Sequence, residues 1–246
     1  MARLITIGSS SVGNAYAVEA GGVILLLEAG RKMSEVKRAI NYRMSDVVGC
    51  VATHAHGDHS KYITDYAKQG IKVYCNSDVE AKKEFPYGSC QIIEHGETYK
   101  IGEFSVVPFD LYHDVPSLGF LVHHDDFGNL VFITDTYKMD FSMTGVDHWL
   151  IEANYDDRIL KANVEDGKID RAQANRLMLS HMSINNTIHY LQDCEVQKFA
   201  KTITLCHLSE RNSDAEMFRD RVAKEFGVPT FVASKGMIVE LNKENV

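Results

Sequence analysis

The sequence predicts an α/β fold in which two β-sheets pack face to face and carry helices on their outer surfaces. Two observations favour it: short apolar runs typical of strands alternate with runs of helical period, and each strand-rich stretch is followed by helices. The 246 residues suffice for one large α/β domain or two small ones. Since no internal repeat, proline-rich linker or long charge block marks a boundary, we expect a single domain over 1–246.

The beginning of the chain is rich in predicted strands. These strands are 4–7, 15–20, 23–27 and 47–53, and the helices predicted among them are 33–43 and 60–69. Gly21 and Gly22 separate the second strand from the third and predict a hairpin, because glycine readily adopts the positive φ of a tight turn.

The pattern returns in the remainder of the chain. Strands are predicted to dominate 72–135, including a continuous apolar run at 130–134, and helices to return after Asn175. Two strands, 230–233 and 237–241, are predicted to close the chain.

The clearest helix start lies near the C-terminus. Ser213 and Glu216 have the spacing of a capping box, in which the serine side chain caps the first turn and the glutamate reaches back. Phe218 and Val222 fall on one face of the predicted helix, and Gly227 ends it.

Composition excludes several classes of protein. The formal net charge of −8 argues against a protein that coats nucleic acid non-specifically, because basic side chains supply that affinity. The first eight residues lack the apolar run of a secretory signal and no later run approaches a membrane span, so we expect a cytoplasmic protein with no membrane partner. Five scattered cysteines predict buried free thiols rather than a disulfide framework.

Four potential metal ligands follow the predicted strand 47–53 within six residues: His54, His56, Asp58 and His59. Imidazole and carboxylate groups together suit zinc, manganese or iron, and the absence of cysteine favours an open, catalytic coordination sphere. Four such side chains would also arise by chance in a solvated loop, but such loops favour serine, asparagine, glycine and proline. The cluster therefore predicts a catalytic metal site.

The hexapeptide from His54 to His59 resembles the H-x-H-x-D-H signature of the metallo-β-lactamase superfamily. That resemblance implies an αββα four-layer sandwich of two mixed sheets flanked by helices, with two divalent metal ions, zinc first and manganese or iron as alternatives. It implies that one ion is bound by His54, His56 and His113, the other by Asp58, His59 and His207, and that Asp135 bridges them. By themselves, Asp135 could be a turn residue and His113 or His207 a core histidine.

Nearly the whole chain resembles the YycJ (WalJ) branch of this superfamily and, more distantly, the RNase Z-like phosphodiesterases. The segments that carry this resemblance are 8–15, 109–120, 152–156, 180–183 and 207–209. In RNase Z-like enzymes the histidine that corresponds to His181 assists proton transfer. We therefore expect Asp58 and His181 to be catalytic, with His181 as general acid for the leaving oxygen; the alternative is a structural histidine beside a helix.

Two positions depart from the pattern of these relatives. Glu28 stands where relatives usually carry an aspartate that organises the ligands, and Tyr137 stands where they often have glycine. The Tyr137 ring would line the substrate pocket or pack. Arg211 would bind a phosphate or form a surface ion pair. The remaining histidines, which match no ligand position, are His95, His123, His124, His148 and His189.

The predicted function is a dinuclear metal-dependent hydrolase, a phosphodiesterase that acts on nucleic acid as a nuclease or on nucleotides. One alternative is a cyclic nucleotide phosphodiesterase of the anti-phage-signalling (anti-Pycsar) type, which the acidic balance favours. A second is an acyl hydrolase of lactams or thioesters. A third, outside enzymes, is a metal-binding scaffold, against which the complete ligand set argues. Since relatives are often dimers, we also expect a homodimer.

Overall fold

The computed structural model describes residues 2–243. Positions 1 and 244–246, which the predicted domain over 1–246 includes, lie outside the described residues. The first sheet consists of β1 (Ala2–Gly8), β2 (Ala15–Ala20), β3 (Val23–Leu27), β4 (Val47–Val51), β5 (Val73–Cys75), β6 (Cys90–Ile92) and β14 (Ile238–Leu241). The second consists of β7 (Tyr99–Ile101), β8 (Phe104–Leu111), β9 (Ser117–His124), β10 (Gly128–Ile133), β11 (His148–Glu152), β12 (Thr202–Cys206) and β13 (Thr230–Val232).

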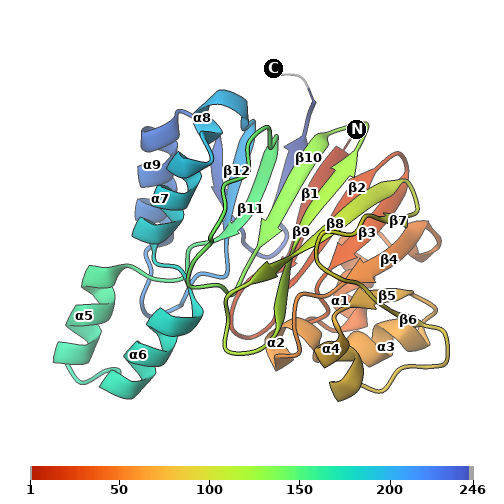
Figure 1. Cartoon of the computed structure of the whole chain (residues 1–246), viewed down its shortest axis with the longest axis horizontal. Coiled ribbons are helices and arrows are strands. Elements are labelled where there is room, and N and C mark those ends of the chain that lie inside the picture. Colours follow the sequence, from red (N-terminus) through yellow and green to blue (C-terminus); the bar gives the residue numbers. More distant parts are fainter. Residues whose placement is uncertain (1, 244–246) are drawn as a thin grey trace.

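Helices cover the outer face of each sheet (Figure 1). They are α1 (Met33–Ala39), α2 (Gly57–Ser60), α3 (Ile63–Lys68), α4 (Ser77–Lys82), α5 (Asp157–Glu165), α6 (Arg171–Ser180), α7 (Ile184–Asp193), α8 (Val196–Phe199) and α9 (Ala215–Phe226), with a 3₁₀ turn, η1, at Met44–Asp46. In Figure 1, α3 and α4 lie on the side of the first sheet, and α7 and α9 on the side of the second. The predicted four-layer arrangement is confirmed.

Both sheets are mixed. The first has the order β14-β1-β2-β3-β4-β5-β6, antiparallel as far as β3 and parallel from β3 to β6. The second has the order β13-β12-β11-β10-β9-β8-β7, parallel from β13 to β10 and antiparallel beyond. Since the C-terminal ends of parallel strands share one edge of a sheet, residues that follow β3, β4, β10, β11 and β12 are gathered at such edges.

The core between the sheets is formed by side chains that alternate inward along the strands. Phe104, Phe120 and Phe132 of the second sheet pack with Tyr16 and Leu25 of the first, all fully or almost fully buried. The Tyr16 and Phe132 rings meet edge to face, 5.6 Å between centroids. Burying one such ring stabilises the fold by about 1.5–3 kcal/mol.

Separate apolar clusters attach the helices. Val36, Tyr66 and Val79 pack α1, α3 and α4 on the first sheet. Leu191 of α7 and Phe218 of α9 pack on the second. Among the described residues, no helix is long and apolar enough to span a membrane.

The predicted strands at the beginning of the chain are confirmed, and the glycine pair forms the hairpin, with φ of 59° at Gly21 and 86° at Gly22. The predicted helix 33–43 is too long. Its helical part ends at Ala39, because Asn41 and Tyr42 take left-handed φ values of 53° and 59°.

Strands dominate 72–135 as predicted, from β5 to β10, although α4 also lies there, its first turn capped by Asn76 Oδ1, which accepts from the amide of Val79 at 2.9 Å. Two other predictions are wrong. Helices return with α5 at Asp157, ahead of Asn175, because Asp156 and Asp170 cap α5 and α6.

The cap of α9 is shifted by one residue. Asp214 Oδ1, not the Ser213 hydroxyl, accepts the amide of Met217 at 3.0 Å. Ser213 is occupied elsewhere, because its hydroxyl donates to the carbonyl of Ser209 at 2.6 Å.

Candidate metal centre

The seven predicted ligands lie together at the edge where parallel strands end. His54 and His56 follow β4, Asp135 follows β10, and His207 follows β12. Asp135 and His207 have left-handed φ values of 50° and 53°, which residues other than glycine seldom adopt. Such backbone strain concentrates at functional sites, where it turns a side chain back across the end of its strand.

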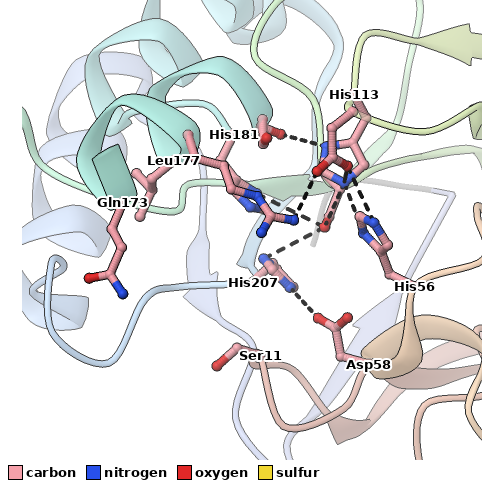
Figure 2. A pocket seen from close by; sticks show the side chains of 12 residues that line it. Ser11, His56, Asp58, His113, Gln173, Leu177, His181 and His207 are labelled. Carbon is pink, nitrogen blue, oxygen red and sulfur yellow. Dashed lines mark hydrogen bonds and ion pairs between the residues drawn. The ribbon is translucent and has the colours of Figure 1, made fainter. Parts of the chain in front are cut away.

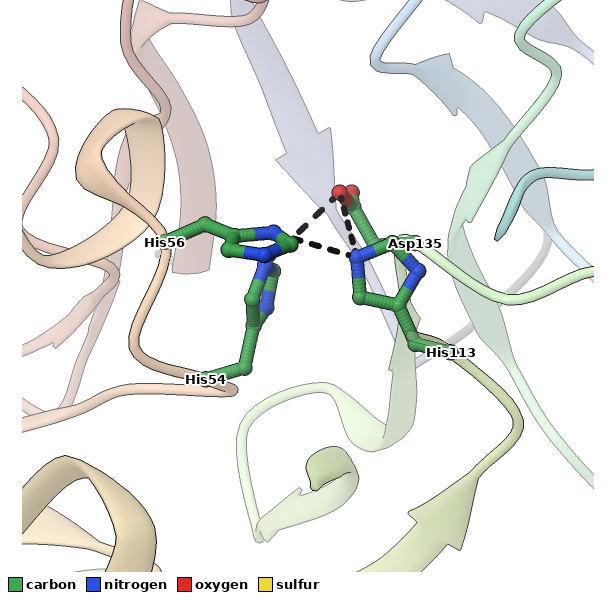
Figure 3. Close-up of side chains that lie close together, drawn as sticks. All are labelled: His54, His56, His113 and Asp135. Atoms are coloured by element: carbon green, nitrogen blue, oxygen red, sulfur yellow. Dashed lines mark hydrogen bonds and ion pairs between the residues drawn. The ribbon is translucent and has the colours of Figure 1, made fainter. Parts of the chain in front are cut away.

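The first candidate group consists of His54, His56, His113 and Asp135, whose ligand atoms all lie within 4.8 Å of one another (Figure 3). His113 Nε2 lies 3.2 Å from His56 Nδ1, and His54 Nε2 lies 3.8 Å from Asp135 Oδ2. His54 Nε2 is buried and has no hydrogen-bond partner among the described residues. Because buried polar atoms are nearly always partnered, this nitrogen fits a metal ligand.

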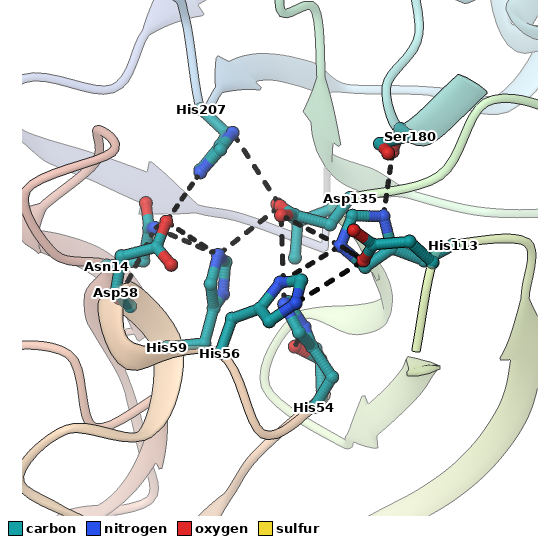
Figure 4. A network of polar contacts seen from close by, with 12 residues as sticks. Asn14, His54, His56, Asp58, His59, His113, Asp135, Ser180 and His207 are labelled. Atoms are coloured by element: carbon teal, nitrogen blue, oxygen red, sulfur yellow. Dashed lines mark hydrogen bonds and ion pairs between the residues drawn. The ribbon is translucent and has the colours of Figure 1, made fainter. Parts of the chain in front are cut away.

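The second candidate group consists of Asp58, His59, Asp135 and His207 (Figure 4). His59 Nε2 lies 3.3 Å from both Asp58 Oδ2 and Asp135 Oδ1, and His207 Nε2 lies 3.2 Å from Asp58 Oδ2. Asp135 belongs to both groups, with Oδ1 toward His59 and Oδ2 toward His54. Imidazoles and carboxylates in two adjoining sets are a donor chemistry that fits divalent cations.

Glu28 supports this arrangement from the end of β3. Its carboxylate is fully buried; Oε1 accepts from the Thr53 hydroxyl at 2.5 Å and lies 3.3 Å from His59 Nδ1. Thr53 Oγ1 in turn lies 2.8 Å from His54 Nδ1. Glu28 therefore orients two candidate ligands through the ring nitrogens that face away from the groups, as expected for an acid that organises ligands.

Glu152 is a buried acid beside the candidate ligands, to which the sequence assigned no role of its own. It is fully buried at the end of β11, and its Oε1 lies 2.6 Å from His181 Nδ1 and 3.3 Å from His207 Nδ1. Its Oε2 accepts from the amides of Thr136 and Met182 at 3.2 Å. Glu152 could have been found from the sequence because it is an acidic residue at the end of a strand that is buried throughout. A buried charge at such a position requires partners.

The carboxylates decide the charge of the buried histidines. Burial lowers the pKa of His207, but Asp135, Asp58 and Glu152 outweigh burial and raise it to about 10. Burial also lowers the pKa of His181, but the charge and hydrogen bond of Glu152 raise it above its ordinary value. For His54, burial dominates and its pKa falls well below the usual range. Without metal, protons on His207 compensate the carboxylates, so metal binding displaces protons and weakens toward low pH.

A cavity of about 250 Å³, called here the site cavity, opens over the groups (Figure 2). Its walls are formed by Ser11, His56, Asp58, His113, Asp114, Asp135, Gln173, Arg176, Leu177, Ser180, His181 and His207. His181, which caps the C-terminus of α6, is stacked on His207 with 5.4 Å between ring centroids. The lining residues of α6 were missed, because nothing in the sequence shows which helix covers the strand ends.

The other positions singled out in the sequence lie elsewhere. The Tyr137 ring packs edge-on against Tyr112, with 6.0 Å between centroids, and Arg211 is exposed; neither lines the site cavity. None of the five remaining histidines belongs to a candidate metal group among the described residues. All five cysteines are free, and four are buried.

Known proteins resemble this chain in sequence and fold. The exodeoxyribonuclease WalJ of Streptococcus pneumoniae is 27% identical over 226 residues, which cover 86% of this chain and 83% of the relative. The metallo-beta-lactamase fold protein YhfI from Bacillus subtilis superposes with a TM-score of 0.76 at 16% identity, covering 97% of this chain and 98% of that one. The short form of human tRNase Z superposes with a TM-score of 0.64 at 15% identity, covering 97% and 99%.

A family model described as a beta-lactamase superfamily domain matches residues 26–207. The match spans well over half of the chain and includes every candidate ligand from His54 to His207. The resemblance expected from the sequence is thereby confirmed, and the chain belongs to the beta-lactamase superfamily.

Proposed function

We propose that this chain is a metal-dependent phosphodiesterase that cleaves nucleic acid, with two divalent ions, zinc first, at the strand ends. The observation that carries the proposal is Asp135, which turns one carboxylate oxygen toward each group of histidines. The relative named as an exodeoxyribonuclease and the likeness to a tRNase Z support a phosphodiester substrate. A cytoplasmic location, a homodimer and a single domain stay predictions.

The residues present would hold the ions as two sets that share Asp135. His54, His56 and His113 would hold one ion, and Asp58, His59 and His207 the other. Two bound cations lower the pKa of a water molecule and neutralise the charge that grows on the phosphoryl oxygens.

His181 would deliver the proton that the departing oxygen needs. Its Nδ1 faces Glu152 Oε1 at 2.6 Å, so Nε2 is the nitrogen left to carry a proton into the site cavity, which His181 lines. The charge and hydrogen bond of Glu152 raise the pKa of His181 above its ordinary value and so favour the protonated ring. Glu152 thus fixes both the orientation and the charge of the proposed general acid.

A second candidate substrate is a 3′,5′-cyclic nucleotide. The site cavity of about 250 Å³ is smaller than most ligand pockets, which span roughly 300–1,000 Å³, and this favours a small substrate. The net charge of −8 also favours a small substrate over a long polyanion. The nucleic-acid assignment is preferred because of the named relative.

Metal-dependent turnover of a substrate panel tests the proposal. The panel contains bis-p-nitrophenyl phosphate, 3′,5′-cyclic nucleotides, short single-stranded DNA, a lactam and a thioester, each with Asp58→Ala beside the wild type. Asp125→Ala is the matched control, because Asp125 is 96% exposed and does not line the site cavity.

Cleavage of DNA that disappears in Asp58→Ala and persists in Asp125→Ala is the expected result. If only the cyclic nucleotides are turned over, the substrate is a 3′,5′-cyclic nucleotide and not nucleic acid. Turnover of the acyl substrates alone, or none at all with metals bound, would contradict the phosphodiesterase.

A further inference from the structure

One wall of the site cavity is a helix that contributes no candidate metal ligand. Gln173, Arg176, Leu177 and Ser180 of α6 all line the cavity, at the three- and four-residue spacing that places side chains on one helix face. Arg176 is the one lysine or arginine among the lining residues that the structure describes. Its side chain is 74% exposed, so it can move at little energetic cost.

Arg176 already holds an anion at this position. Its Nη2 donates to Asp114 Oδ2 at 3.0 Å, while Asp114 Oδ1 lies 3.3 Å from His56 Nε2 and 3.2 Å from His113 Nε2. The Asp114 carboxylate therefore spans the distance from the guanidinium to the histidines of the first group. A phosphate carries the same kind of oxygens and forms bidentate bonds with arginine.

The small size of the site cavity is a second reason to expect a phosphate beside Arg176. At about 250 Å³ the cavity lies below the roughly 300–1,000 Å³ of most ligand pockets, so a polymer substrate extends beyond it across one of its walls. Asp114 also lines the cavity and, unlike Asp58 and Asp135, would hold no ion, so its carboxylate repels a further phosphate unless a cation stands beside it. α6 offers the Gln173 amide, the Ser180 hydroxyl and the Arg176 guanidinium there, and only the guanidinium is charged.

We propose that Arg176 exchanges Asp114 for the phosphate next to the scissile one and so makes the site prefer oligonucleotides over isolated phosphodiesters. The proposal rests on the proposed function and extends it to substrate length. Arg176 is accordingly a binding residue, whereas a merely structural Arg176 would do no more than hold Asp114 in place.

The test compares Arg176→Ala and Arg176→Lys with Arg171→Ala. Arg171 begins the same helix, is exposed and does not line the site cavity, so its variant removes an equal charge from α6. KM and kcat are measured for short single-stranded DNA and for bis-p-nitrophenyl phosphate between 50 and 200 mM salt. The Kd of a phosphorothioate oligonucleotide is measured by fluorescence anisotropy without metal.

Arg176→Ala is expected to raise the Kd, and the KM for DNA relative to that for bis-p-nitrophenyl phosphate, by about tenfold or more. The slope of log KM against log salt should shrink by about 0.7, as for one lost phosphate contact on a single strand. Arg176→Lys should keep the slope and lose part of the affinity, because it keeps the charge without the planar fork. Arg171→Ala should match the wild type.

Equal changes of KM on both substrates, or a lower kcat with unchanged Kd and salt slope, would reduce Arg176 to a structural partner of Asp114 and overturn the proposal. If the wild type hydrolyses neither substrate, the proposed function fails. The anisotropy measurement still decides about Arg176 in that case, since it requires no turnover.

Discussion

The two sheets build the candidate metal centre in different ways. The first sheet contributes four of the seven candidate ligands from one segment that follows β4 and enters α2, within six consecutive residues. The second contributes His113, Asp135 and His207 from the ends of β8, β10 and β12, which lie up to 94 residues apart in the sequence. The first set is positioned by the local backbone, whereas strand pairing positions the second.

Each sheet also supplies one fully buried glutamate. Glu28 follows β3 and contacts His59, while Glu152 ends β11 and contacts His181 and His207. The two acids differ in the histidines that they orient. Glu28 orients only candidate ligands, whereas Glu152 also orients His181, the proposed proton donor. This difference predicts separate consequences when each is removed.

The largest effect is expected where the two sheets share a residue. Asp135→Ala removes the carboxylate common to both groups, so both ions should be lost and kcat/KM should fall by more than about 10⁴-fold. His207→Ala, which alters the second group alone, should keep one ion per chain. Metal content by mass spectrometry and steady-state kinetics measure this. Two ions retained by Asp135→Ala would rule out the shared carboxylate.

The next effect separates proton transfer from metal binding. His181→Ala should lower kcat on DNA by about 10²–10⁴-fold, the range of a general acid. On bis-p-nitrophenyl phosphate the loss should be far smaller, because p-nitrophenolate departs without being protonated. His189→Ala, an exposed histidine on α7, is the control. Equal losses on both substrates would show that His181 acts through the metal site instead.

The second sheet is also expected to limit stability in acid. His148, at the other end of β11 from Glu152, is 1% exposed, and burial lowers its pKa to about 4. In the unfolded chain the His148 imidazole binds a proton near pH 6.5, whereas in the folded chain it binds one only near pH 4. The free energy of unfolding that is present above pH 6.5 is therefore lost as the pH falls toward 4. The loss reaches about 3 kcal/mol.

Urea unfolding of metal-free protein at pH 7 and pH 4.5 measures this loss. His148→Gln should flatten the pH dependence, and His123→Gln, a half-exposed control on β9, should leave it unchanged. A wild type equally stable at both pH values would contradict the assignment.

The smallest effect compares the two buried glutamates. Glu28→Ala and Glu152→Ala should each weaken metal binding by about 10–100-fold, the usual effect of removing a group that orients a ligand. At saturating metal, Glu152→Ala alone should still lower kcat on DNA, because His181 has lost its partner. Metal titration with a competing chelator measures affinity, and Glu165→Ala, 67% exposed, is the control. If the two variants have the same kcat on DNA at saturating metal, the two acids have equivalent roles and the prediction is wrong.

Prediction from sequence succeeded where the signal is local. The hairpin at Gly21 and Gly22 follows from their positive φ, and the alternation in β8 appears as alternating burial of Phe104 and Val106 against Ser105. It failed for α4 and α5, because the caps Asn76 and Asp156 lie in stretches whose apolar residues also fit strands or loops. Asparagine and aspartate can cap a helix, but they do so only when the backbone takes the cap conformation, which the residue type permits and does not enforce.

The sequence by itself indicated the cluster of candidate metal ligands from His54 to His59, because this cluster depends on residue types at fixed spacing, and the family and the four-layer fold followed from its resemblance to the superfamily signature. Only the tertiary structure decided that Glu152 supports His181 and that Arg176 faces Asp114 across the site cavity. The physical reason is that strand pairing and helix packing join residues 29 and 62 positions apart, and no local pattern records which strand ends become neighbours.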